Sequence, residues 1–296
     1  MKVLLIGCGQ TGGAIAFELV KTKYVEKLGL YSRTVKSSKA LAFDLHNSKV
    51  SVLENLEDIE KYNYVVIALS GISDSEREKS FKDSRTSYQV RQDELKYNLG
   101  AVAGLIPFLK KLPRKTGIVV VTNPVDEMTN YLRISLNHQK IFGFGMELDV
   151  RRYSKVLGKI ISCIGIHGKA VPLINSSSPS SYEEIYRRAD NELMDYLRRN
   201  GIPHQAAGKV FVEFFSRLTG KKKEVVHVSY FLKQKFCDVK DISISLPFVL
   251  ERGEVLGIAP IKVNSIEQKK FQIVALGLKN SVNHILKASL KLTAYR

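Results

Sequence analysis

One stretch near the start decides the fold: Lys2-Val3-Leu4-Leu5-Ile6-Gly7-Cys8-Gly9-Gln10-Thr11-Gly12-Gly13. Its apolar run leads directly into the pattern Gly-x-Gly-x-x-Gly, and residues 14–20 continue with the apolar spacing of a helix. A strand, a glycine turn and a helix in this order are typical of a dinucleotide-binding unit. Gly7 suits the tight turn, Gly9 the close approach of a pyrophosphate, and Gly12 the close packing of helix on strand. The alternative is a glycine turn without a ligand.

The segments beyond this unit alternate between candidate strands and helices up to about residue 145. Apolar runs that read as strands lie at 27–31, 50–53, 64–69, 117–122 and 141–144. After residue 145, expected strands (160–164, 171–174, 225–232, 242–250) mix with helical stretches at about 182–200 and 204–219. We therefore predict an α/β protein: a Rossmann-type doubly wound parallel sheet in a dinucleotide-binding domain at 1–145, and a mixed α+β substrate domain at 146–296.

Two further segments carry local predictions. Ser265-Ile266-Glu267-Gln268 has the spacing of a capping box, so a long C-terminal helix is expected to begin there. The polar stretch 72–84 has little apolar periodicity and follows a buried strand, and we predict a long loop in the position of an active-site lid. The alternative for this stretch is a surface insertion.

Composition narrows the class of protein. The chain has 296 residues, of which 44% are hydrophobic and 25% charged, as in ordinary globular proteins. No apolar run approaches the roughly 18 to 20 residues that span a bilayer. A strand that begins at once leaves no room for a signal peptide, and the three cysteines are scattered. The expectation is a cytoplasmic protein without a structural metal and without a membrane role.

The net charge of +17 is spread along the chain, and the densest basic run, Lys221-Lys222-Lys223, is short. A basic surface attracts nucleic acids, but the sequence has no helix-turn-helix, zinc-finger or RNP-like signature. We predict a lysine-rich surface with basic pockets for small anions, and no nucleic acid as the main partner.

Four different motifs lie at predicted strand ends and helix starts. They are Arg91-Gln92-Asp93-Glu94-Leu95-Lys96-Tyr97-Asn98, Thr122-Asn123-Pro124-Val125, Leu148-Asp149-Val150-Arg151-Arg152 and Ile164-Gly165-Ile166-His167-Gly168. In this order the chain resembles the lactate/malate dehydrogenase family of L-2-hydroxy acid dehydrogenases over nearly its full length. The first motif looks most like the 2-hydroxyisocaproate dehydrogenase branch. The resemblance implies hydride transfer between a 2-oxo acid, or its L-2-hydroxy acid, and a nicotinamide cofactor, in a homodimer or homotetramer.

The resemblance also implies roles for individual residues. His167 matches the proton donor and acceptor, a role that suits a side chain with an ordinary pKa near 6.5, and Asp149 matches the carboxylate that orients it. Arg152 matches the arginine that grips the substrate carboxylate, for which a planar guanidinium is well shaped. Arg91 matches the lid arginine that polarises the carbonyl, and Asn123 the contact to cofactor and substrate. Taken singly, each has a structural alternative, such as a buried histidine or a solvated arginine.

The cofactor is expected to lie along residues at three strand ends: Gly7, Gly9, Gln10, Thr11 and Gly12, then Ser32 and Arg33, then Ser70, Gly71 and Asn123. An acidic residue about 20 positions beyond the glycine motif usually binds the ribose 2′-hydroxyl, and Ser32-Arg33 stand there instead. Since serine and arginine suit a 2′-phosphate, we predict NADP(H) over NAD(H). The alternative is a loosely selective NAD site.

Two departures from the family pattern concern the substrate. Arg85 stands six residues before Arg91, where malate dehydrogenases place an arginine for a second carboxylate, but the lid stretch is longer than usual. Arg85 is thus either a specificity residue or one of several loop cations. The stretch from His167 to Val171-Pro172 is one residue short. The rival to an active enzyme is a catalytically silent nucleotide-binding or regulatory protein of the same fold, and the sequence leaves the acid substrate open.

Overall fold

A computed structural model of the protein describes residues 1–138 and 140–294, and its first half is a parallel sheet. The strand order is β3-β2-β1-β4-β5-β6, with every neighbouring pair parallel. The strands are β1 (Lys2–Ile6), β2 (Lys27–Tyr31), β3 (Val50–Val52), β4 (Tyr64–Ile67), β5 (Gly117–Val120) and β6 (Ile141–Gly143). This order, which reverses direction at β1, confirms the doubly wound Rossmann-type fold.

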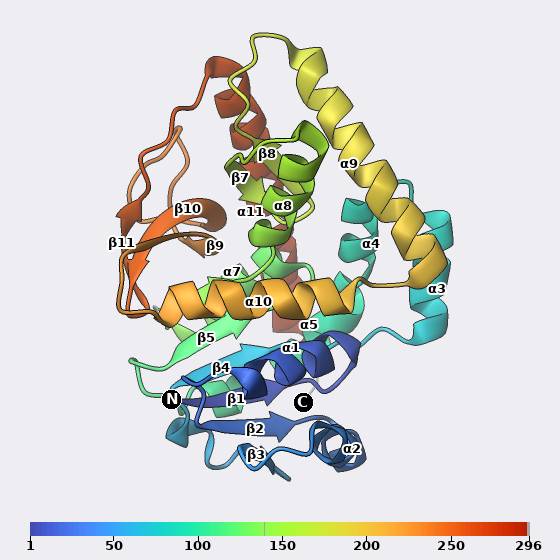
Figure 1. Ribbon diagram of the computed structural model, residues 1–296, viewed down its shortest axis with the longest axis vertical. Helices are drawn as coiled ribbons and strands as arrows, with labels where there is room; N and C mark the ends of the chain where they lie inside the picture. The colour runs from blue at the N-terminus through green and yellow to red at the C-terminus, as the bar shows by residue number, and fades with distance from the viewer. Residues whose placement is uncertain (139, 295–296) are drawn as a thin grey trace.

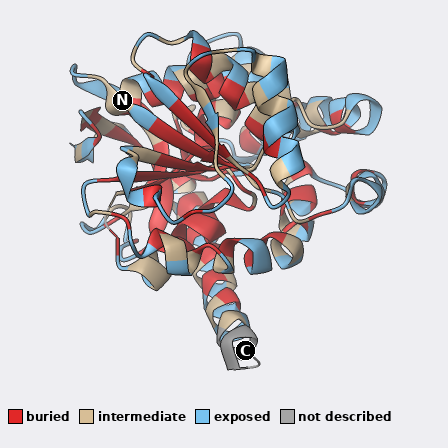
Figure 2. Cartoon of the chain, turned by 90° about the horizontal axis from the view of Figure 1, so that it is seen from below, coloured by how far each residue is buried: buried red, intermediate tan, exposed pale blue. Residues whose placement is uncertain are grey.

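Helices lie between these strands. They are α1 (Gln10–Lys21), α2 (Val35–Leu45), the short 3-10 helix η1 (Ile59–Lys61), α3 (Asp74–Asp83), α4 (Ser87–Asp93), α5 (Leu95–Ala103), α6 (Ile106–Leu109) and α7 (Val125–Leu136). The central strands are covered on both faces, so residues 65–67 of β4 and all of β5 are buried, while the edge strand β3 is only partly buried. Figure 2 shows the buried strands at the centre and exposed outer faces of helices. At the start of α1, a Cβ on Gly12 would lie 1.9 Å from the carbonyl oxygen of Gly7, so only glycine fits.

The second half of the chain extends the same sheet with antiparallel strands. They are β7 (Cys163–Ile166), β8 (Lys169–Pro172), β9 (Glu224–Phe231), β10 (Ser243–Glu251) and β11 (Glu254–Ile258), with helices α8 (Met146–Leu157), α9 (Pro179–Asn200), α10 (His204–Thr219) and α11 (Ser265–Ala294). β9 joins β6 through the pair Gly143 and Ser229. Because one sheet runs through both halves, the division near residue 145 stays a prediction.

An aromatic cluster ties the two halves together. α10 lies along α1 (Figure 1) and carries Phe211, Phe214 and Phe215, all fully buried. Phe144, which follows β6, packs against the first two rings, and Tyr64 of β4 packs edge-on against Phe215. These rings belong to one continuous hydrophobic core that includes residues of both halves. Burial of such large side chains stabilises the two halves as one body.

The prediction of a long loop at 72–84 is wrong, because this stretch is mostly helix α3. Ser73 caps α3 by accepting from the backbone N–H of Glu76, and Thr86 caps α4 by accepting from Gln89; both are complete capping boxes. Most residues of α3 are exposed, and two of the three buried residues of α4 are Ser87 and Arg91, so the two helices show little apolar periodicity. Residues 72–93 are called the lid segment below. Phe81 and Val90 dock this segment on α9 against Met194 and Leu197.

The capping box at the start of α11 lies one residue earlier than predicted. Asn264, not Ser265, accepts from the backbone N–H groups of Ile266 and Glu267, and Glu267 accepts in return from the N–H of Asn264. Glu267 is fully buried and also accepts from the backbone N–H groups at 174 and 175 and from the hydroxyl of Tyr182. One carboxylate thus holds three segments together.

Replacing Glu267 by alanine should cost about 3 kcal/mol of the free energy of unfolding, because several buried donors lose their acceptor together. Urea unfolding followed by circular dichroism measures this. The control is Glu184→Ala, which removes an exposed carboxylate from α9 and should change the free energy of unfolding by less than about 0.5 kcal/mol. A loss below about 1 kcal/mol in Glu267→Ala would show that other acceptors replace it.

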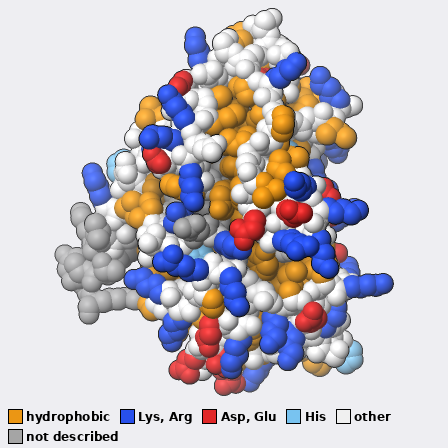
Figure 3. All heavy atoms as spheres, turned by 90° about the vertical axis from the view of Figure 1, so that its left-hand side faces the viewer, with side chains coloured by type: hydrophobic (Ala, Val, Ile, Leu, Met, Phe, Trp, Pro, Cys, Tyr) orange, Lys and Arg blue, Asp and Glu red, His pale blue; other side chains and the backbone are white. Residues whose placement is uncertain are grey.

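The positive charge is spread over the surface. On the face shown in Figure 3, lysine and arginine side chains are scattered from one end of the molecule to the other between apolar and acidic groups. Among the described residues, no helix is long and apolar enough to cross a membrane. That nucleic acids are not the main partner stays a prediction.

Candidate active site

A cavity of about 690 Å³ lies over the carboxyl ends of the parallel strands. The glycine loop after β1, the residues after β2, β4 and β5, and the lid segment line it from the first half of the chain. Residues of α8, α9 and the β7–β8 turn line it from the second half. Carboxyl ends of parallel strands meet at one edge of a sheet, which is why segments far apart in sequence come together here.

The residues predicted to bind the cofactor meet in this cavity. Those that line it are Gly7, Gly9, Gln10, Thr11, Ser32, Arg33, Ser70, Gly71 and Asn123. Gly12 lies beneath the loop, where it allows the helix to pack closely. A Cβ on Gly9 would meet no atom within 4 Å, so a bound group can approach the loop there. Free N–H groups at the start of α1 suit phosphates, and these residues therefore fit a dinucleotide.

His167 sits in the two-residue turn between β7 and β8. The register pairs Ile166 with Lys169, which leaves His167 and Gly168 as the connection. Gly168 has φ +84°, which favours glycine, and a Cβ there would lie 2.8 Å from Nη1 of Arg91. The short turn therefore holds the imidazole firmly and leaves room for the guanidinium of Arg91.

A buried carboxylate orients the histidine. Nδ1 of His167 lies 2.8 Å from Oδ2 of Asp149, which also accepts from the N–H of Gly168 at 2.9 Å. Arg152 donates to Oδ1 of Asp149 at 3.2 Å. Burial raises the pKa of Asp149, but His167 and the two arginines outweigh it and hold that pKa well below its usual range. Asp149 is therefore ionised.

The pKa of His167 is lowered to about 4, chiefly by burial, with the charges of Arg91 and Arg152 adding to the effect and Asp149 opposing it. The imidazole is thus neutral near pH 7. Since an ionised carboxylate faces Nδ1, the proton of the neutral ring lies on Nδ1, and Nε2 is left as an acceptor.

Arg91 and Arg152 reach the cavity from two different helices, α4 and α8. Arg91 lies near the end of α4, rather than at the start of a helix as predicted, and is 8% exposed. Its Nη1 donates to the carbonyl oxygen of Ser87 at 2.6 Å. Arg152 comes from α8, and both arginines line the cavity with His167. Two guanidinium groups beside a histidine form a site for an anion.

Two predicted substrate-site residues, Arg85 and Asp149, do not line this cavity; Asp149 still contacts His167, whereas Arg85 has no such link to the site among the described residues. Arg85 is exposed between α3 and α4 and lines a second cavity of about 840 Å³, on the other side of Arg152. The extra length of the lid segment forms α3 and α4, so a count of six residues back from Arg91 ends outside the first cavity. The sequence could not show this displacement.

Three site residues were missed by the sequence analysis. Asp126, directly after Asn123-Pro124-Val125, accepts from the backbone N–H of His167 at 2.8 Å and from Ser245. Burial raises its pKa to about 7. Arg77 of the lid segment and Glu94, the residue directly after that segment, also line the cavity. The position of Asp126 behind a candidate motif was a usable signal; the positions of Arg77 and Glu94 depend on how the lid segment folds.

Comparisons with known proteins agree with this geometry. Residues 1–143 match a family model described as lactate/malate dehydrogenase, NAD binding domain. An L-lactate dehydrogenase of Pseudothermotoga lettingae is 23% identical, covering 92% of this chain and 92% of its own. A malate dehydrogenase of Methanothermobacter marburgensis is 25% identical, covering 97% of each.

Solved structures show the same fold. The malate dehydrogenase of Aeropyrum pernix superposes with a TM-score of 0.78 at 20% identity and covers 95% of this chain and 97% of its own. A lactate dehydrogenase from a Medee basin deep-sea metagenome library gives a TM-score of 0.79 at 18% identity, with coverages of 96% and 98%.

Proposed function

We propose that the chain belongs to the lactate/malate dehydrogenase family and interconverts a 2-oxo acid and an L-2-hydroxy acid with a nicotinamide cofactor. The observation that carries the proposal is that His167, Arg91 and Arg152 meet in the cavity that holds the glycine loop, with Asp149 bound to both His167 and Arg152. The nicotinamide, when bound, accepts or supplies the hydride. Membership of the 2-hydroxyisocaproate branch stays a prediction.

The residues act on the substrate in complementary ways. Arg152 binds the carboxylate, and Arg91 faces the oxygen on the carbon that reacts and stabilises the charge that develops there. In oxidation, Nε2 of His167 accepts the hydroxyl proton, and Asp149 stabilises the imidazolium. In reduction the protonated ring donates. A bound carboxylate offsets the two arginines that lower the pKa of His167, so substrate binding favours the protonated ring.

A panel of 2-oxo acids, assayed with NADH and with NADPH, tests the activity. Turnover of at least one acid is expected. The second candidate function, a silent nucleotide-binding or regulatory protein, is favoured only by the enlarged lid segment and the short histidine turn. It predicts cofactor binding without turnover across the whole panel. We also propose a homodimer or homotetramer, which light scattering measures.

For the cofactor, we propose a preference for NADP(H). Arg33 lines the cavity and is exposed there, and the hydroxyl of Ser32 donates to the carbonyl oxygen of Thr34 at 2.8 Å. Neither side chain repels a 2′-phosphate, whereas the acid usual at this point would. The guanidinium of Arg33 supplies the positive charge.

Replacing Arg33 by alanine should raise the dissociation constant of NADPH by about tenfold, equivalent to about 1.4 kcal/mol, and leave that of NADH within about twofold. Because the chain has no tryptophan, the fluorescence of the bound reduced nicotinamide is followed to measure both constants. Lys27→Ala, which removes an exposed cation from the far end of β2, should change neither. A clear preference of the wild-type protein for NADH would contradict the proposal.

A further inference from the structure

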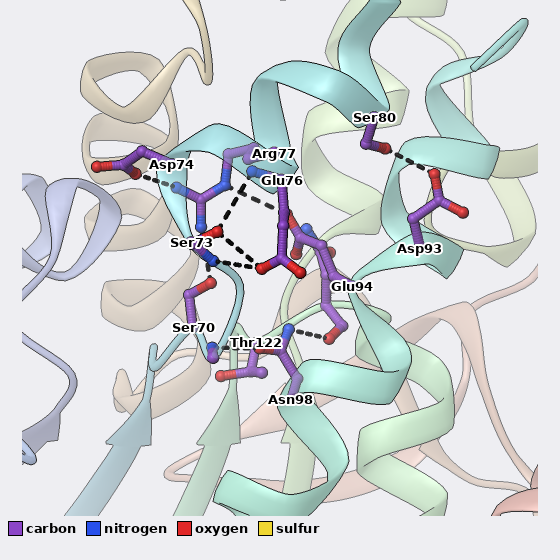
Figure 4. Close-up of polar contacts among 12 residues, drawn as sticks. Ser70, Ser73, Asp74, Glu76, Arg77, Ser80, Asp93, Glu94, Asn98 and Thr122 are labelled. Atoms are coloured by element: carbon purple, nitrogen blue, oxygen red, sulfur yellow. Dashed lines mark hydrogen bonds and ion pairs between the residues drawn. The ribbon is translucent and has the colours of Figure 1, made fainter. Parts of the chain in front are cut away.

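Arg77 is a second lid-segment arginine that points into the active-site cavity. Figure 4 shows its guanidinium between Ser70, Asp74 and Glu94. Nη2 donates to the hydroxyl of Ser70 at 2.7 Å and Nη1 to Asp74 at 3.2 Å. The side chain is 14% exposed and lines the cavity. Arg77 is therefore a largely buried charge on a ligand-facing wall.

The guanidinium is incompletely paired. Its Nε is buried and has no hydrogen-bond partner among the residues that the structure describes. Glu94 lies 3.7 Å from this nitrogen, beyond hydrogen-bonding distance, and Asp74 is 92% exposed, so water screens its charge. Since buried charges in proteins are normally paired and hydrogen-bonded, this one has capacity for a further anion.

The neighbours of Arg77 locate that anion. Ser70 follows β4, which lies between β1 and β5 in the sheet. The glycine loop follows β1 and Asn123 follows β5, so the guanidinium stands between the expected places of the phosphates and of the substrate. The described residues that line the cavity include four arginines, Arg33, Arg77, Arg91 and Arg152, and two carboxylates, Asp74 and Glu94; a third carboxylate, Asp149, pairs with Arg152 from behind the wall. The wall carries an excess of positive charge.

We propose that Arg77 binds an oxyanion of the bound ligands and thereby helps to hold the lid segment over them. The inference rests on the proposed function, since the oxyanion belongs either to the cofactor diphosphate or to the second carboxylate of a dicarboxylic 2-oxo acid. A guanidinium forms paired hydrogen bonds with either group. Asp74 and Glu94 keep it in place until the ligand arrives.

Arg77→Gln separates the two sources. The dissociation constant of the reduced cofactor and the kcat/KM values for oxaloacetate and pyruvate are measured in parallel with the wild-type protein. A diphosphate partner raises the cofactor constant about tenfold and leaves the oxaloacetate to pyruvate ratio unchanged. A carboxylate partner leaves the cofactor constant within about twofold and lowers that ratio about tenfold. If the folded variant changes neither quantity, the proposal is wrong.

Further variants distinguish the loss of an oxyanion contact from unfolding of the lid segment. Arg77→Lys keeps the charge and should recover part of the loss. Glu94→Gln removes a competing carboxylate and should tighten oxyanion binding, and a loss of affinity there would count against the proposal. Lys79→Ala removes an exposed cation of the same helix and should behave as wild type. Wild-type turnover tests the proposed function, and only the variant-to-wild-type ratios test Arg77.

Discussion

Replacing His167 by asparagine should lower kcat/KM for a 2-oxo acid by about 10²- to 10⁴-fold, the usual contribution of a positioned acid or base. The dissociation constant of the reduced cofactor should stay within about twofold, because the glycine loop and Ser32-Arg33 are untouched. Asparagine keeps a polar group beside Asp149 but cannot carry the proton. Activity close to wild type would exclude His167 as the proton carrier.

A matched control exists in His138. It is also buried, but it hydrogen-bonds to the carbonyl oxygen of Thr116 and does not line the cavity. His138→Asn should therefore leave turnover unchanged.

The pH dependence gives a second readout. In oxidation the neutral imidazole is required; its pKa of about 4 in the free protein means that kcat/KM falls only as the pH drops toward that value. The small residual activity of His167→Asn should lack this acidic limb.

Replacing Arg152 by glutamine should have the second largest effect. Removal of one partner from a largely desolvated charge pair costs about 2 to 5 kcal/mol, so kcat/KM for the 2-oxo acid should fall by about 30- to 3,000-fold. Arg152→Lys keeps the charge but loses the planar guanidinium, so its kcat/KM should lie between that of the wild-type protein and that of Arg152→Gln. Cofactor affinity should be nearly unchanged in both. Steady-state kinetics and fluorescence titration measure these quantities.

Arg151 provides the control, because it neighbours Arg152 but points to Glu213 on α10. Arg151→Gln should leave kcat/KM within about twofold. Arg152→Gln should also raise the pKa of His167, since Arg152 lowers it, and move the acidic limb of the oxidation profile to higher pH. A profile that does not move, together with unchanged kcat/KM, would rule out Arg152 at the carboxylate.

The sequence was sufficient for the parallel half of the fold because each buried strand is a short apolar run closed by a turn. β4 and β5 are covered on both faces, so nothing polar interrupts them. The helices of the lid segment were harder to predict from the sequence, because capping boxes rather than apolar periodicity mark α3 and α4. Ser73-x-x-Glu76 and Thr86-x-x-Gln89 were the signals to read.

Site residues could be predicted from the sequence where they belong to one short motif with a fixed spacing. Asp149 and Arg152 share one helix face, and His167 is fixed by its turn. Arg85 and Arg77 show the limit, because which lid arginine enters the cavity depends on how α3 and α4 dock on α9. Distance along the chain says nothing about that docking. Asp126 and Glu267 act through backbone N–H groups of distant segments, and such partners become visible only in three dimensions.

The continuous sheet limits how ligands enter and leave. The glycine loop, Asn123 and the histidine turn stand on one hydrogen-bonded sheet with a shared hydrophobic core, so we expect the two halves to move little relative to each other. We expect the lid segment to be the wall that moves, because only a small apolar cluster that includes Phe81 and Val90 anchors it on α9. The residence time of a bound ligand is then expected to depend on how tightly this cluster packs. Substitutions in the cluster can therefore change the rates of ligand binding and release without changing the rate of the chemical step.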